Sequence, residues 1–187
     1  MKHYLRFPLL LLLLVGSLFA CRPNTADSDV TAAAEQKVAV PTTVYLVRHA
    51  EKDISNPSDE NPDLTLAGKA RAEALRSLLD GEQVHALYAT KYIRTINTLK
   101  PLAEDRALEI RQYGGHDFNG IREKLLQEHR GQTVVIAGHS NTLLPMIEAL
   151  GAKRPVSDIA DSEYNYVFKL TIDPENKTTV ELNQFGG

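Results

Sequence analysis

The stretch Thr43-Val44-Tyr45-Leu46-Val47-Arg48-His49-Ala50-Glu51 decides the fold prediction, because a strand-like run ends here in charged and titratable side chains. Residues 43–47 are β-branched, aromatic or aliphatic without alternation, which is typical of a strand buried on both faces. Arg48 and His49 follow this run directly. Ligands of an open α/β sheet bind beyond the carboxyl ends of its strands. The stretch therefore predicts both a central strand and one wall of a ligand site.

The rest of residues 42–187 alternates helix-like and strand-like segments, which indicates one enzyme-sized domain. We predict helices over 64–79, 92–104, 119–129 and 141–150. We predict further strands over 86–89, 108–111 and 133–137. This alternation predicts an α/β fold with a mostly parallel sheet and helices on both faces. Two last strands, 164–172 and 178–182, surround a turn that contains Pro174 and predict an antiparallel edge near the C-terminus.

Two other strand ends carry similar side chains. Arg94 lies shortly after the second predicted strand, and His139 follows the strand over 133–137. Parallel strands end at one edge of a sheet, so we expect these two residues to meet Arg48 and His49. Guanidinium groups bind phosphate oxygens in pairs, and imidazole can act as nucleophile or donor. A metal site is the alternative, but the arginines would repel a cation. We therefore predict a phosphate site with no metal and no cofactor.

The motifs resemble, in order, those of the histidine phosphatase, or phosphoglycerate-mutase-like, superfamily, in its small branch-1 form. Four segments over about 42–150 carry the resemblance: Leu46 to Glu51, Leu64 to Gly68, Tyr88 to Thr95, and Val135 to Ser140. The resemblance implies that His49 becomes a phosphohistidine. It also implies that Arg48 and Arg94 hold the phosphate and that His139 is a second imidazole facing it. No cofactor is implied.

Further phosphate contacts are predicted after the second histidine. Ser140 and Asn141 could cap the helix that follows and direct amide groups at the phosphate, because helix N-termini favour anions. Chain order alone suggests that residues 157–166 border the same crevice. These two segments would complete the walls around the four charged and imidazole side chains.

The proton donor for the leaving group is the least defined role. Larger members of the superfamily use a glutamate after the third strand, but the matching loop here, 112–118, contains no glutamate. It offers Asp117, our first candidate for the general acid, and His116. Glu51, two residues beyond the nucleophile, is the second candidate, and Asp53 is the third.

Both leading carboxylates also have a structural interpretation. Asp117 could cap the helix that follows it, because aspartate is a preferred N-cap residue. Glu51 could instead form an ion pair with Lys52 or Arg94 at the rim of the crevice. The sequence leaves both interpretations open for each residue.

The N-terminus predicts export. Residues 1–21 have a basic start, an apolar run and a small residue before Cys21, as in a secretory signal peptide. The charge-free stretch of 14 residues from Phe7 to Ala20 is shorter than the roughly 18 residues of a membrane-spanning helix. Leu18 to Cys21 resembles a lipobox, which would make Cys21 the lipidated terminus of a periplasmic, membrane-anchored lipoprotein. The alternative is an ordinary signal peptide with an incidental thiol. Residues 22–41 resemble a flexible tether.

The function predicted from these features is a phosphatase. A net charge of −3 excludes an extended basic surface for nucleic acid. We predict hydrolysis of phosphate esters or phosphohistidine, on a small phosphorylated substrate or a phosphoprotein, in two displacements through His49. The alternative is a non-catalytic lipoprotein that binds a phosphorylated ligand in the same pocket. The sequence sets no oligomeric state.

Overall fold

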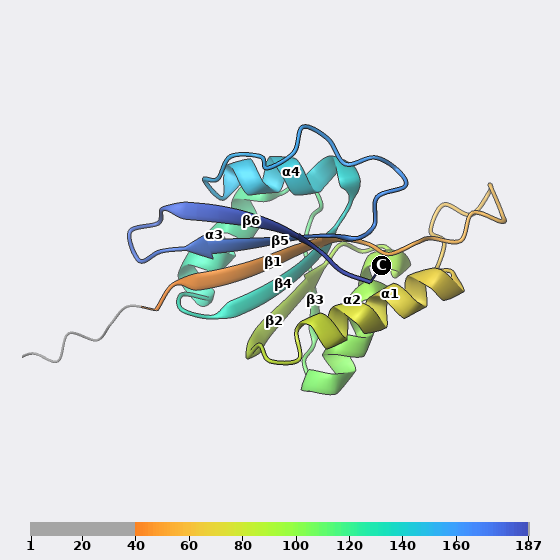
Figure 1. Cartoon of the computed structure of the whole chain (residues 1–187), viewed down its shortest axis with the longest axis horizontal. Coiled ribbons are helices and arrows are strands. Elements are labelled where there is room, and N and C mark those ends of the chain that lie inside the picture. Colours follow the sequence, from red (N-terminus) through yellow and green to blue (C-terminus); the bar gives the residue numbers. More distant parts are fainter. Residues whose placement is uncertain (1–39, 187) are drawn as a thin grey trace, which may run out of the picture. The chain divides into compact units, whose positions relative to one another are not determined.

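A computed structural model describes residues 40–186 of the chain (Figure 1). The predicted signal peptide, Cys21 and all of the predicted tether except residues 40 and 41 lie outside the described residues. Within 40–186, no helix is long and apolar enough to cross a membrane.

Within residues 40–186, six strands form a single sheet in the order β3-β2-β4-β1-β5-β6. The strands are β1 (Thr42–Arg48), β2 (Val84–Ala89), β3 (Ile110–Gln112), β4 (Thr133–Gly138), β5 (Tyr166–Ile172) and β6 (Thr178–Gln184). The first four are parallel to one another, whereas β5 runs antiparallel to β1 and β6 antiparallel to β5. This arrangement confirms the mostly parallel sheet and the antiparallel edge.

In the described part of the chain, four helices cover the two faces of the sheet, as the alternation predicted (Figure 1). They are α1 (Leu66–Leu78), α2 (Ile93–Arg106), α3 (Phe118–Glu128) and α4 (Ser140–Ala149). Successive residues of β1 point to opposite faces because the side chains of a strand alternate. Val44 and Leu46 pack in the cluster with the apolar residues of α3 and α4, and Tyr45 and Val47 in the cluster with those of α1 and α2. The central strand is therefore buried on both faces.

The register of β1 against β4 brings two distant segments to one point. Arg48 lies beside Gly138 at the ends of the two parallel strands, and the His49 amide donates a hydrogen bond to the Gly138 carbonyl at 2.9 Å. His49 and His139 therefore leave the sheet side by side. Parallel pairing makes this juxtaposition necessary, because both strands end at the same edge.

Helix α1 begins later than the predicted residue 64. Leu64 instead forms an isolated antiparallel bridge with Lys52, and Thr65 is the N-cap, its hydroxyl accepting from the Gly68 amide at 3.0 Å. Thr65 also binds the Glu51 carbonyl through its amide at 2.9 Å. A side chain on Gly68 would collide with the backbone of Glu51. Threonine and glycine at this spacing thus clamp the segment that follows His49.

Candidate active site

The four residues expected to converge do so at the carboxyl edge of the parallel strands. The rings of His49 and His139 have centroids 5.3 Å apart in an edge-to-face arrangement. Arg48 and His49 are buried, with 5% and 4% of their surfaces exposed. Arg94, near the start of α2, and His139 are half-buried. Two imidazoles and two guanidinium groups therefore meet at one place, and we call the site of Arg48, His49, Arg94 and His139 the recess.

The ring of His49 is held in one tautomer. Its Nδ1 lies 2.8 Å from the Ala50 carbonyl, which can only accept, so Nδ1 carries the proton and Nε2 keeps a free lone pair. The Ala50 amide is itself held by the Thr98 hydroxyl at 2.9 Å. Burial, followed by the nearby His139 and arginine charges, lowers the pKa of His49 to about 3. His49 is thus a neutral imidazole at physiological pH, the form that can attack phosphorus.

His139 is oriented by a chain of buried threonines. Its Nε2 lies 3.0 Å from the Thr90 hydroxyl, which lies 2.8 Å from the Thr95 hydroxyl. Burial is the largest cause of a pKa lowered to about 4, and the charges of Arg94 and Arg48 act in the same direction. His139 is therefore also neutral near pH 7 and can offer a hydrogen bond within the recess.

Arg48 organises the segment before β5. Its Nη1 donates to the carbonyls of Ala160, Asp161 and Glu163 at 2.8, 3.1 and 3.0 Å. The guanidinium carbon also lies 4.2 Å from the ring centroid of Tyr164, whose ring centroid is 6.0 Å from that of His49. Residues 160–164 thus border the recess, as chain order suggested. Nη1 of Arg48 is therefore occupied by hydrogen bonds to the backbone.

Arg94 stacks on a tyrosine ring, as Arg48 does on Tyr164. The guanidinium carbon of Arg94 lies 4.3 Å from the ring centroid of Tyr92, and this ring meets His139 edge to face at 5.2 Å. Sequence reasoning assigned no role to Tyr92 or Tyr164. The position of Tyr92 two residues before Arg94 was the only available signal for the first, and nothing local signals the second.

The two arginines also carry unused donors. Three buried side-chain N–H groups within residues 40–186 have no hydrogen-bond partner: Arg48 Nε, Arg94 Nε and, at the far end of α2, Arg106 Nε. Buried donors are normally satisfied, and an anion held by Arg48 and Arg94 would satisfy the first two. Burial lowers the pKa of Arg94, which reflects a guanidinium held out of water without a counterion.

Neither leading carboxylate is free to serve as the general acid. Asp117 is exposed and caps α3, its side chain accepting from the Gly120 amide at 2.9 Å, which is the structural alternative considered above. Glu51 pairs with Arg71, which donates through Nε at 3.0 Å and Nη2 at 2.7 Å, and not with Lys52 or Arg94. Burial is the largest single effect and raises the pKa of Glu51, but the hydrogen bonds from Arg71 and the backbone, together with the charges of Arg71 and Arg48, lower it on balance. The weaker candidate Asp53 is exposed and binds the Ser55 amide.

The predicted helix cap after the second histidine is shifted by one residue. Helix α4 begins at Ser140, so His139 is the N-cap, and the Thr142 hydroxyl accepts from its amide at 3.0 Å. Ser140 and Asn141 lie in the first turn, and the prediction that their side chains cap the helix was wrong. Their backbone amides still belong to a helix N-terminus at the edge of the recess, where an anion is favoured.

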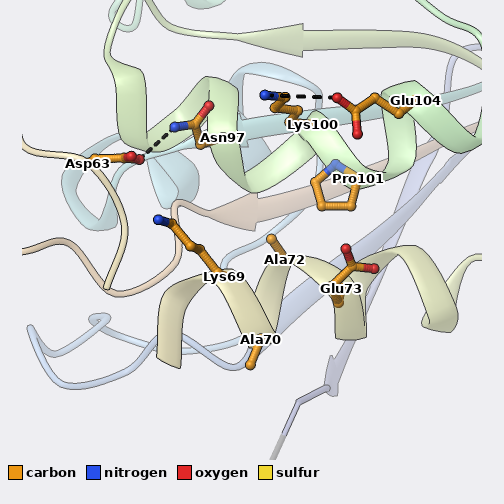
Figure 2. Close-up of a pocket in the computed structure, with 9 residues that line it drawn as sticks. All are labelled: Asp63, Lys69, Ala70, Ala72, Glu73, Asn97, Lys100, Pro101 and Glu104. Carbon is orange, nitrogen blue, oxygen red and sulfur yellow. Dashed lines mark hydrogen bonds and ion pairs between the residues drawn. The ribbon is translucent and has the colours of Figure 1, made fainter. Parts of the chain in front are cut away.

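Two cavities among residues 40–186 differ in their relation to this recess. One, of about 590 Å³, opens beside His139 and is lined by Thr90, Lys91, Tyr92, Gln112, Tyr113, Gly114, Gly115, His116 and His139. The other, of about 480 Å³, lies between α1 and α2 (Figure 2). Its polar groups largely pair with each other, as Asp63 does with Asn97 and Lys100 with Glu104. The first cavity shares His139 with the recess, whereas the second shares none of the four central residues.

The buried state of His49 predicts a pH-dependent stability. Its folded pKa of about 3 lies below the ordinary value of 6.5 that it regains on unfolding. Between these values the unfolded chain binds a proton that the folded protein excludes, so the free energy of unfolding falls as the pH is lowered. His139 acts in the same direction. We expect urea unfolding to show lower stability at about pH 5 than at about pH 7.5, and a smaller difference in His49→Gln. An equal difference in both proteins would contradict this account.

Comparison with known proteins agrees with the fold and the motifs. Residues 44–115 match the family described as the histidine phosphatase superfamily (branch 1). Among curated proteins, none matches the sequence. The protein histidine phosphatase SixA, solved with tungstate, superposes with a TM-score of 0.64 at 16% identity, covering 77% of this chain and 97% of SixA. YhfR of Bacillus stearothermophilus superposes with a TM-score of 0.62 at 17% identity, covering 76% of this chain and 96% of YhfR. A mycobacterial glucosyl-3-phosphoglycerate phosphatase superposes with a TM-score of 0.61 at 13% identity, covering 79% of this chain and 99% of that phosphatase. At these identities the superpositions establish the fold.

Proposed function

We propose that this chain, whose residues 44–115 match branch 1 of the histidine phosphatase superfamily, is a phosphatase that works without a metal and forms a phosphohistidine on His49. One observation carries the proposal: a neutral, tautomer-fixed imidazole lies in a recess where Arg48 and Arg94 each keep a buried Nε donor without a partner. The superfamily match and the phosphatases among the structural neighbours support phosphatase activity in general.

The geometry supports a two-step displacement. The phosphoryl group is held between the two guanidinium groups, and Nε2 of His49 attacks phosphorus as the bond to the leaving oxygen or nitrogen breaks. The transition state spreads charge over the phosphoryl oxygens, and fixed positive groups stabilise it most. His139 adds a neutral donor. Water then attacks the phosphohistidine, which returns His49 and releases inorganic phosphate.

The substrate class follows from the same recess. Phosphate esters and phosphohistidine share the tetrahedral phosphoryl group that the arginines would hold, so both remain within the proposal, on a small molecule or a protein. Residues 1–21 and Cys21 support a further proposal, that the enzyme is exported and acts at the envelope as a lipid-anchored protein. The substrate would then be a phosphorylated component of that compartment.

One observation favours a second function. Asp117 and Glu51 are both engaged in structural contacts, so neither is available as a carboxylic acid in the recess. A protein with the same phosphate pocket and no proton donor would bind a phosphorylated ligand without turnover. Binding of inorganic phosphate would be retained in that case, and phosphate release would be absent.

The deciding experiment measures phosphate release from p-nitrophenyl phosphate by the purified full-length protein in mild detergent, with and without a chelator. We expect turnover that the chelator leaves unchanged, because the arginines supply the positive charge. Loss of turnover on chelation would overturn the metal-free mechanism. Binding of inorganic phosphate with no turnover of this ester or of phosphoimidazole would favour the non-catalytic alternative.

A further inference from the structure

The cavity beside His139 is the place considered for a leaving group, because His139 belongs both to its lining and to the phosphate recess. None of the residues that line this cavity has a carboxylate side chain. An alkoxide leaves slowly unless it receives a proton, so an enzyme for ordinary esters needs a donor here. The cavity must therefore offer a different protic group if the proposed phosphatase acts on such esters.

Most protic groups in the cavity are already committed. His139 is neutral, with a pKa of about 4, and its Nε2 contacts the Thr90 hydroxyl at 3.0 Å. Tyr113 is half-buried, its hydroxyl lies 3.4 Å from the Ala137 carbonyl, and burial raises its pKa. Lysine and tyrosine side chains in general release their protons only well above neutral pH. Imidazole is the side chain most often used for proton transfer near pH 7.

The loop after β3 places an imidazole in this cavity. The Tyr113 amide donates to the Ala89 carbonyl at 3.0 Å, which continues the parallel pairing of β3 with β2. The two glycines that follow bring the loop against the site, since a Cβ on Gly115 would lie 3.2 Å from Thr90 Cγ2. The next residue is His116, which is exposed and lines the cavity. Thr90, which lines the same cavity, is the residue whose hydroxyl contacts His139.

The position of His116 is supported by a second effect. Charge on His116 is one of the causes that lower the pKa of His139, after burial and the two arginines. The ring of His116 also meets Phe118 at a centroid distance of 6.1 Å, edge to face. His116 is thus an exposed imidazole among the residues that line the cavity.

We propose that His116 is the proton donor for the leaving group, in the place that a carboxylic acid would otherwise take; this rests on the proposed phosphatase function. In the first step, Nε2 of His49 forms a bond to phosphorus, the bond from phosphorus to the ester oxygen breaks, and that oxygen takes a proton from imidazolium His116. In the second step, neutral His116 takes a proton from water as its oxygen attacks phosphorus. His49 leaves with the electron pair of the P–N bond, and His116 is again protonated.

The test is the dependence of kcat/KM on the leaving group. The full-length protein and His116→Gln are compared on p-nitrophenyl, phenyl and alkyl phosphates, because nitrophenolate leaves without a proton and an alkoxide does not. We expect His116→Gln to lose less than about threefold on the nitrophenyl ester and about 100-fold or more on the alkyl ester. Asp117→Asn, on the same loop but outside the cavity, is the matched control and should lose the same small factor on all three esters.

The outcomes separate this inference from the function on which it rests. A protein that hydrolyses none of the three esters contradicts the proposed ester hydrolysis itself. A protein that hydrolyses them while His116→Gln reduces all three equally, or none, overturns the proton-donor role alone. A steep leaving-group dependence in Asp117→Asn with a flat one in His116→Gln would move the role to Asp117. A thermal unfolding curve for each variant shows whether a uniform loss reflects unfolding.

Discussion

Replacement of His49 by alanine will reduce phosphate release from p-nitrophenyl phosphate by at least about 1,000-fold in kcat, because the nucleophile is lost while the rest of the recess remains. The proposed mechanism makes Nε2 of His49 the electron-pair donor in the bond to phosphorus. Only Nε2 of this ring is both free of a protein partner and presented by a fixed Nδ1 contact. His139, the other imidazole, already uses its Nε2 on Thr90.

Two further measurements make this result specific to the nucleophile. The parent protein, mixed with a labelled phosphate ester and quenched in alkali, should retain label on the protein, whereas His49→Ala should not. Inorganic phosphate should still bind the variant, since Arg48 and Arg94 are unchanged. His85→Gln is the matched control, because His85 accepts from the Thr133 amide at 3.1 Å and lies at the opposite end of β2. Activity of His49→Ala equal to that of His85→Gln would sink the mechanism.

Substitution of Arg48 and Arg94 will show that both arginines serve activity but that only Arg48 also stabilises the fold. Arg94→Ala should lower kcat/KM by about 100- to 1,000-fold, as removal of a fixed donor from a developing anion does elsewhere. Arg48→Ala should lose at least as much activity. It should also lose roughly 1–3 kcal/mol in the free energy of unfolding, because three carbonyls of residues 160–163 lose their shared donor. Arg94 makes no such contact with the backbone among the described residues.

The measurements are kcat/KM and urea unfolding for each variant. Arg76→Ala serves as the control, since Arg76 lies on α1 with a surface ion pair to Glu73 and should change neither quantity appreciably. Addition of inorganic phosphate should stabilise the parent protein more than Arg94→Ala, because ligand binding to the folded state raises its stability. The separate role assigned to Arg48 would be contradicted if Arg48→Ala and Arg94→Ala had the same free energy of unfolding and inorganic phosphate stabilised both to the same extent.

The sequence alone determined the layers of the fold and the centre of the site. Apolar runs of strand length and apolar residues at helical spacing report which faces are buried, so the alternation in 42–150 specified a parallel sheet with helices on both faces. Parallel strands end at one edge, so the positions of Arg48, His49, Arg94 and His139 after their strands or at the next helix were enough to predict their convergence. Both inferences use local patterns and one rule of connectivity.

Only the tertiary structure decided which partners those side chains have. Glu51 pairs with Arg71, and Tyr164 stacks on Arg48 across 116 positions of the chain, because the paths of loops and the register of strands bring them together. His129, directly after the last residue of α3, is 5% exposed, with its Nε2 2.9 Å from the hydroxyl of Tyr88. Periodicity records the burial of a face, whereas a hydrogen bond or ion pair depends on the position of one atom set by many non-local contacts.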